Sequence, residues 1–249
     1  MRRPNETGAN APSVKHSRKF PDPRDNQSQD LPPLALARLL DKSLMALLAV
    51  VVSLAHPSSP GASPPYDAAL HAAQIGQAEA SSCEREATAE AMRATPETLE
   101  SPLSRLAHAY RRAFDALGAA CLLLGDDTVP LPPAAEPLVE RASQAARQLV
   151  KVTDLIYNER GLGSTEHLCA YISELENQAD VMYRGAVNAL FGLKAAERVG
   201  SSTGSSRRGR GVWTPEHTRR FHLLNALESL TDRCEEIASE LLLLEYTMA

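Results

Sequence analysis

The chain has 249 residues, a formal net charge of -5 and only 4% aromatic residues. This length allows one large or two small domains with a substantial core. Ala and Leu are abundant, and because they lead the helix-propensity scale we expect an all-helical protein. No segment is typical of a β-strand. The negative net charge argues against a nucleic-acid partner.

The four cysteines are widely spaced and form no Cys-x-x-Cys pair. Cys121, Cys169 and Cys234 lie among apolar residues at helical spacing, whereas Cys83 does not. Buried thiols of this kind are typical of small core residues in a reducing compartment. A zinc site built from thiolates is therefore not expected.

The first part of the chain changes from polar to apolar near residue 33. Residues 1–32 are polar and hold several Pro and Asn, so we expect a disordered tail. Residues 34–55 are dense in Leu, Ala and Val, but the uninterrupted apolar run is too short to span a membrane. A buried first helix is the favoured interpretation. A secretory signal or membrane-associated segment is the alternative.

Breaks rich in Pro, Ser and Gly separate the next segments. A Pro/Ser/Gly linker over 56–65 precedes a helix predicted at 66–95. Ser101 is suited to cap a helix that begins at Pro102 and ends at Leu124.

The second half contains three further predicted helices, over 134–158, 166–191 and 216–245. Ser164 or Thr165 is expected to cap the middle one, and Thr214 the last one. Between the last two helices, residues 200–211 are rich in Gly, Ser and Arg. A solvated surface loop is the favoured interpretation of this segment, and contact of its arginines with phosphate groups or lipid is the alternative.

Two acidic motifs of the form Leu-Glu-x-x-x-Asp occur in these last two helices. One places Glu176 and Asp180 one helical turn apart, and the other does so for Glu228 and Asp232. In both motifs the leucine belongs to the predicted buried seam and the Glu follows it directly, so the carboxylates border the core. Carboxylates at such an edge need partners, because burying an unpaired charge is costly.

A metal ion or an arginine can supply that partner. Four carboxylates on two helices suit Mg²⁺, Mn²⁺ or iron, and Glu235 can add a fifth ligand. In the structural alternative, Arg184 and Arg233 pair with the acids across the helix contact. No Glu-x-x-His pair, phosphate loop or nucleophile motif is present, so we do not expect an enzyme.

An ordered set of residues in the second half resembles the PhoU-like phosphate transport regulators, specifically the Pit-accessory family. The matching strings are Ile172-x-x-Leu-Glu-Asn-Gln-Ala-Asp-x-x-Tyr-Arg184, Ala189-Leu-Phe191 and Leu227-Glu-x-x-Thr-Asp-Arg-Cys-Glu-Glu-Ile-Ala238. The resemblance implies an antiparallel bundle of about six helices in two three-helix repeats. These repeats would occupy 33–133 and 134–249.

The resemblance also implies a function and a ligand. It implies that Glu176, Asp180, Glu228 and Asp232 bind a divalent or ferric ion (Mg, Mn, Fe or Zn). It further implies that the protein regulates an inorganic phosphate permease of the Pit type. Such a protein would be cytoplasmic, with a peripheral position at the inner face of the membrane and self-association left open.

The first repeat departs from the family pattern. The string Thr98-Leu-Glu-Ser-Pro-Leu-Ser-Arg105 resembles the link between the second and third helices of the family. The expected acidic pair upstream of it falls near Ser81 and Arg85, and downstream Asp115 supplies a single carboxylate. We therefore expect at most one metal site, in the second repeat.

Overall fold

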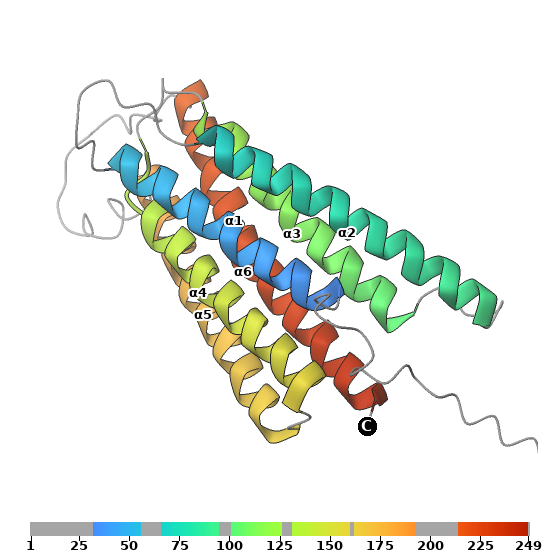
Figure 1. The fold of residues 1–249 in the computed structure, drawn as a ribbon. Helices are drawn as coiled ribbons and strands as arrows, with labels where there is room; N and C mark the ends of the chain where they lie inside the picture. Colours follow the sequence, from blue (N-terminus) through green and yellow to red (C-terminus); the bar gives the residue numbers. More distant parts are fainter. Residues whose placement is uncertain are drawn as a thin grey trace, which may run out of the picture. The chain divides into compact units, whose positions relative to one another are not determined.

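A computed structural model describes residues 32–55, 66–94, 101–125, 131–159, 162–192 and 214–248. All regular structure in these ranges is helical, which confirms the expected fold class (Figure 1). A π-helical turn, Leu155–Glu159, continues the fourth helix. The helices are α1 (Pro32–Ala55), α2 (Tyr66–Ala94), α3 (Pro102–Leu124), α4 (Ala135–Asp154), α5 (Leu162–Leu190) and α6 (Pro215–Met248).

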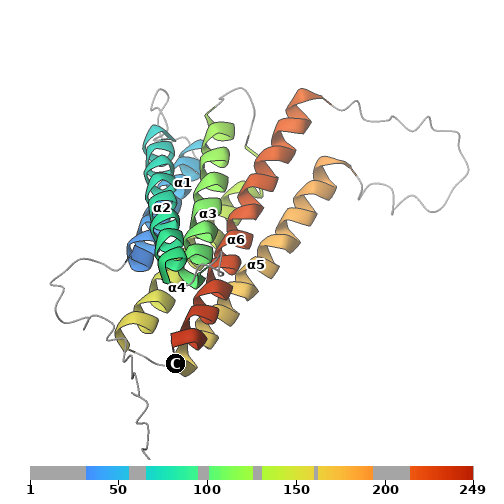
Figure 2. The same cartoon turned by 90° about the vertical axis from the view of Figure 1, so that its right-hand side faces the viewer.

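The helices pair in the same way in the two halves of the chain. In the first half α2 packs against both α1 and α3, and in the second half α5 packs against both α4 and α6. The halves meet where α1 packs on α4 and α3 packs on α6. Figure 2 shows α2 and α5 on opposite sides of the four remaining helices. The contacts of α2 with α3 therefore have their counterpart in those of α5 with α6.

One continuous apolar core joins all six helices. The seam predicted in α6 is buried, as Leu227 and Cys234 show, and so is the middle of the α5 seam at Ile172 and Leu175. Beyond Ala179 the α5 seam is only partly buried, because Met182 and Ala186 lie at the edge of the core. Helix α1 contributes completely buried leucines to this core, as expected of a buried first helix. None of the helices described is both long enough and apolar enough to cross a membrane.

The predicted helix caps are confirmed in two of three cases. Ser101 Oγ accepts a hydrogen bond from the Ser104 amide at 3.1 Å, and Thr214 Oγ1 accepts one from the His217 amide at 3.4 Å. The third prediction is wrong for Thr165. Helix α5 begins earlier, at Leu162, so Thr165 lies inside it and donates to Glu245 of α6 at 2.6 Å.

All four cysteines are free thiols, and the three expected in the core, Cys121, Cys169 and Cys234, are buried there. Burial raises the pKa of the Cys234 thiol to about 12, which keeps it protonated and unreactive. Three predictions concern segments outside the described residues: the tail before residue 32, the linker at 56–65 and the arginine-containing loop at 200–211.

Candidate metal centre

Helices α5 and α6 pack in antiparallel register, which places the two acidic motifs opposite each other. Three side-chain hydrogen bonds define this register: Thr165 to Glu245, Ser173 to Glu235 at 2.5 Å, and Tyr183 to Asn225 at 3.4 Å. As the residue number rises along α5, the number of its partner falls along α6. The register therefore sets Glu176 opposite Asp232 and Asp180 opposite Glu228.

The four carboxylates, which we call the acidic cluster, act on one another electrostatically. Burial first, and then the charges of Asp232, Asp180 and Glu176, raise the pKa of Glu228 from 4.5 to about 7. The pKa of Glu176 is also raised, first by burial and then by Glu235, Asp232 and Asp180. These charges come from both helices, so the cluster is one electrostatic unit.

Asp232 has a raised pKa for the same principal reason, burial, although the Arg233 guanidinium opposes the shift. Acidic neighbours from both helices, Glu235 and Asp180 among them, add to it. A carboxyl group with a raised pKa prefers its neutral form, so ionising the cluster costs free energy at neutral pH. A positive charge at this position would lower that cost.

The structural alternative is wrong in expecting the arginines to pair across the helix contact, although Arg184 does pair with one of the four acids. Arg184 Nη2 lies 2.6 Å from Asp180 Oδ2 on its own helix, and Arg233 Nη1 lies 2.7 Å from Glu236 Oε2 on its own helix. Arg184 is 64% exposed, so its pair with Asp180 is screened by water. Within the described part of the chain, Glu176, Glu228 and Asp232 form no ion pair with a basic residue.

Glu235, the suggested fifth ligand, lies beside the cluster but has its own partner. Its Oε1 accepts the hydrogen bond from Ser173. Next to it, small side chains leave an open groove of about 270 Å³ between α5 and α6. The groove is lined by Glu166, Cys169, Ala170, Ser173, Glu235, Ala238, Ser239 and Leu242. Solvent therefore reaches this side of the interface.

The carboxylates are not gathered at coordination distance. Among the described residues, no three His, Cys, Asp or Glu side chains converge closely enough to hold a metal ion. The backbone register brings the predicted residues together, while their side chains remain apart. Cation binding would require these side chains to turn toward a common point.

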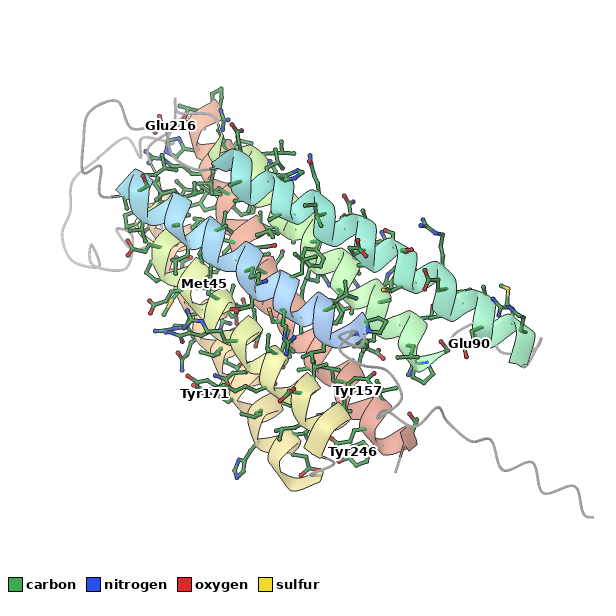
Figure 3. All side chains as sticks on the ribbon, in the orientation of Figure 1. Met45, Glu90, Tyr157, Tyr171, Glu216 and Tyr246 are labelled. Atoms are coloured by element: carbon green, nitrogen blue, oxygen red, sulfur yellow. The ribbon has the colours of Figure 1, made fainter. Side chains whose placement is uncertain are left out.

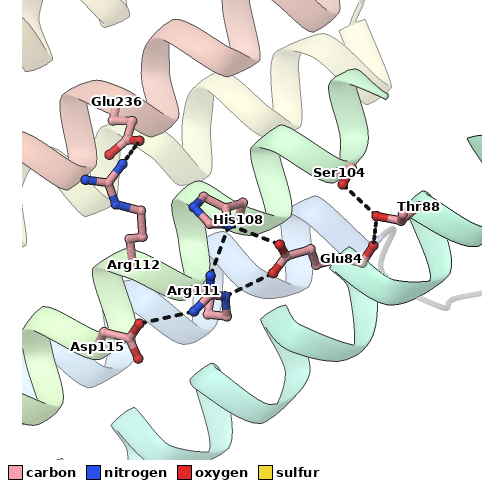
Figure 4. A network of polar contacts seen from close by, with 8 residues as sticks. All are labelled: Glu84, Thr88, Ser104, His108, Arg111, Arg112, Asp115 and Glu236. Carbon is pink, nitrogen blue, oxygen red and sulfur yellow. Dashed lines mark hydrogen bonds and ion pairs between the residues drawn. The ribbon is translucent and has the colours of Figure 1, made fainter. Parts of the chain in front are cut away.

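The counterpart contact between α2 and α3 contains a polar network that the sequence did not reveal (Figure 4). Arg111 of α3 lies between two carboxylates, 3.0 Å from Glu84 of α2 and 3.5 Å from Asp115 of its own helix. Gln77 of α2 also donates to Asp115, and His108 Nδ1 lies 3.0 Å from Glu84. An arginine thus supplies the positive charge at this interface.

The pKa of Glu84 reflects this arrangement. Partial burial alone would raise it, but hydrogen bonds from His108 and Arg111 outweigh burial and hold the pKa below its usual range. The i, i+4 spacing of Arg111 and Asp115 was visible in the sequence, whereas their link to Glu84 depends on how α2 packs on α3.

A further pair of arginines connects the two halves. Glu236 of α6 accepts a hydrogen bond from Arg112 of α3 at its Oε1 and one from Arg233 at its Oε2, both at 2.7 Å. Figure 4 shows the first of these contacts. Arg105 of α3 also pairs with Glu240 of α6 at 3.0 Å. The α3/α6 contact is therefore held by ion pairs as well as by the core.

In comparisons with known proteins, no protein-family model and no curated protein matches the chain. The acidic cluster is therefore the feature of the described residues from which a function can be proposed.

Proposed function

We propose that the protein is a non-catalytic accessory protein that binds a metal cation between α5 and α6. The facing pairs Glu176 with Asp232 and Asp180 with Glu228 carry this proposal. Burial first, and then the like charges of the facing acids, raise the pKa of Glu228 to about 7, so keeping all four carboxylates ionised destabilises the folded state. A bound cation would resolve it.

The donor set favours a hard or borderline cation. It consists of carboxylate oxygens, which suit Mg²⁺, Mn²⁺ or iron, whereas zinc more often takes histidine or cysteine ligands. The described histidines lie elsewhere in the bundle or pair with other groups, as His108 does with Glu84. We therefore rank Mg²⁺, Mn²⁺ and iron ahead of Zn²⁺ as the ligand.

The biological role that we propose is regulation of inorganic phosphate transport, beside a permease of the Pit type at the cytoplasmic face of the membrane. Its support is the resemblance of the second half to PhoU-like proteins, together with six helices that pair alike in the two halves. The alternative is a metal-free interaction bundle. The same-helix contacts of Arg184 and Arg233 favour that alternative, since each moderates part of the negative charge.

Metal titration of the chelator-treated protein separates these two functions. We expect stoichiometric binding of Mn²⁺, Mg²⁺ or iron by calorimetry and a higher unfolding temperature in their presence, because a ligand of the folded state alone adds stability. The variant Glu176→Gln with Asp232→Asn should lose both effects. The matched control Glu86→Gln with Glu90→Gln removes two exposed carboxylates of α2 and should keep them.

If a saturating concentration of cation leaves the unfolding temperature of the wild-type protein unchanged, the metal-free interaction bundle is the better description. The transport role has its own test, which is reconstitution with a Pit-type permease in vesicles. Phosphate uptake should change when the protein is added, and it should not change with an equal amount of the Glu176→Gln, Asp232→Asn variant.

A further inference from the structure

The groove between α5 and α6 extends from the acidic cluster toward the end of the bundle where Tyr246 lies, away from Glu216 (Figure 3). The α6 residues that line it recur every three or four positions, so they follow one face of the helix. They are Glu235, Ala238, Ser239 and Leu242, and Tyr246 continues the row one turn further. From the helical rise, this row is about 16 Å long, the length of about three helical turns.

The floor of the groove consists of small or apolar side chains. Ala170 and Ser173 of α5 lie opposite Ser239 and Ala238 of α6 in the antiparallel register, and Leu242 adds an aliphatic surface. Ala170 and Ser239 are exposed, so nothing in the described part of the chain covers them. The backbone of another chain can therefore approach closely along this line.

Negative charge lines the groove without a basic residue to balance it. Glu166 and Glu235 belong to the lining, which contains no Lys or Arg. Among the described residues each carboxylate has only a hydroxyl partner: Tyr246 donates to Glu166 at 2.6 Å, and Ser173 donates to Glu235 at 2.5 Å. A hydroxyl group is neutral and leaves the negative charge in place. The groove is therefore complementary to a positively charged occupant.

We propose that this groove binds a basic amphipathic helix of another protein. A helix presents side chains to a groove at positions i, i+3, i+4 and i+7, which matches a row of three turns. Its small or aliphatic side chains would pack on the floor, and its Lys or Arg side chains would pair with Glu166 and Glu235. The ring of Tyr246 is 60% exposed and offers its face to the same cations. This docking requires neither a bound metal nor the transport role.

Size and charge favour this occupant over three others. Pockets for small molecules commonly measure about 300–1,000 Å³ and enclose their ligand, whereas this groove of about 270 Å³ is open. It is large enough for a few side chains of a larger partner. A nucleic acid would bring negative charge to an acidic surface. A second copy of the chain, with its net charge of -5, would also be repelled.

Fluorescence anisotropy of a labelled model peptide tests the proposal on the chelator-treated full chain. The probe is a helical peptide with Leu and Ala on one face and Lys on the other, and its counterpart has Glu in place of every Lys. We expect only the Lys peptide to bind, and added salt to weaken its binding. The groove-filling variant Ala170→Leu with Ser239→Leu should weaken binding roughly tenfold or more. Glu166→Lys should weaken it by a similar factor, because it places like charges together.

Matched controls come from α2, which lies on the opposite side of the bundle from α5 (Figure 2). Ala78→Leu with Ala89→Leu adds the same volume at two exposed positions, and Glu90→Lys makes the same change in charge. Neither control should alter peptide binding. The variant Glu176→Gln with Asp232→Asn should also keep it, so loss of the metal site is distinguishable from loss of the docking groove. Circular dichroism should show that every variant is folded.

Three results would overturn the proposal. The first is failure of the wild-type protein to bind the Lys peptide. The second is an equal loss of binding in the groove variants and in the α2 controls, which would indicate attraction to the acidic surface as a whole. The third is self-association of the wild type in analytical ultracentrifugation that the groove-filling variant abolishes, because a second copy would then occupy the groove.

Discussion

At the α2/α3 interface an arginine lies between two carboxylates, whereas at the α5/α6 interface four carboxylates face one another with no basic side chain of the described residues between them. The two interfaces occupy corresponding places in the two halves. In the first, His108 and Arg111 make Glu84 easier to ionise, and in the second, burial and like charges make Glu228 harder to ionise. The comparison teaches that the first interface supplies its own positive charge, whereas the second leaves its carboxylates without one from the opposite helix.

The largest expected effect concerns how closely α2 approaches α3. In Gly76→Ala, the added Cβ would collide with the ring of Phe114, which is itself buried. Overpacking of this kind costs about 1–3 kcal/mol, which chemical denaturation should measure. The matched change on the other side, Gly185→Ala of α5, meets no neighbouring atom within 4 Å. It should be neutral or stabilise by up to about 1 kcal/mol. Equal destabilisation by both variants would contradict the difference in packing.

Placing an arginine in the acidic cluster should make the second interface behave like the first. In Glu228→Arg one of the four carboxylates is replaced by a positive charge facing Asp180 across the interface. We expect the chelator-treated protein to gain on the order of 1–2 kcal/mol of stability, because like-charge pairs become opposite-charge pairs. Divalent cations should no longer raise its unfolding temperature. The neutral control Glu228→Gln should show a smaller gain, and a loss of stability in both variants would disprove the repulsion.

The two interfaces should respond to pH in opposite directions. Glu228 has a folded-state pKa of about 7 against an ordinary 4.5, so its proton stabilises the folded state fully below the ordinary value. That contribution is lost as pH rises through about 7. We expect the chelator-treated protein to lose about 1 kcal/mol between roughly pH 5 and pH 8, and Glu228→Gln to flatten this slope.

Glu84 supplies the reverse case. Its pKa is lowered in the folded state, so its contribution is present above the ordinary value of 4.5 and is lost as pH falls further. Glu84→Gln should therefore leave the slope between neutral and alkaline pH unchanged and reduce the acid-side loss. Thermal unfolding across pH for the two variants checks both signs, and a common slope would refute the assignment.

The smallest expected effect comes from removing the arginine of the first interface. In Arg111→Met, Glu84 keeps its contact with His108 and Asp115 keeps its hydrogen bond from Gln77. The variant should therefore lose only about 0.5–1 kcal/mol of stability at low salt. Added salt should shrink the difference because the pairs are partly exposed. Arg184→Met, which removes a pair on one exposed helix face, should change stability by much less. A larger cost for Arg184→Met would mean that its pair with Asp180 supports the second interface.

The sequence was sufficient to predict the helices and the acids that lie on the facing sides of α5 and α6. The helical spacing of apolar residues predicted the seams of α5 and α6. The α6 seam is buried, and the α5 seam is buried as far as Ala179. Because Glu176, Asp180, Glu228 and Asp232 all border the seams, antiparallel packing brings them to the same interface. Local rules also found the caps at Ser101 and Thr214, since capping depends on only a few neighbouring residues.

The sequence did not predict which partner a polar side chain contacts when several lie nearby. Arg233 lies next to Asp232 in the chain but pairs with Glu236 one turn on, because long side chains select among competing acids in three dimensions. Thr165 was a candidate cap, but α5 begins at Leu162 and the Thr165 hydroxyl donates to Glu245 of α6. The Glu84–Arg111 ion pair depends on the register of α2 against α3. Apolar periodicity does not determine this register, because shifting one helix by a whole turn keeps the same faces in contact.

Glu236 has a consequence for any attempt to divide the protein. Its two oxygens hold one guanidinium from each half of the chain, Arg112 and Arg233, and Arg233 also moderates the charge of Asp232 and Glu228. A fragment that begins at α4 would lose Arg112, and Arg233 would then have Glu236 to itself. The pKa values of Asp232 and Glu228 in such a truncated half would therefore differ from those in the intact chain, although both residues are retained.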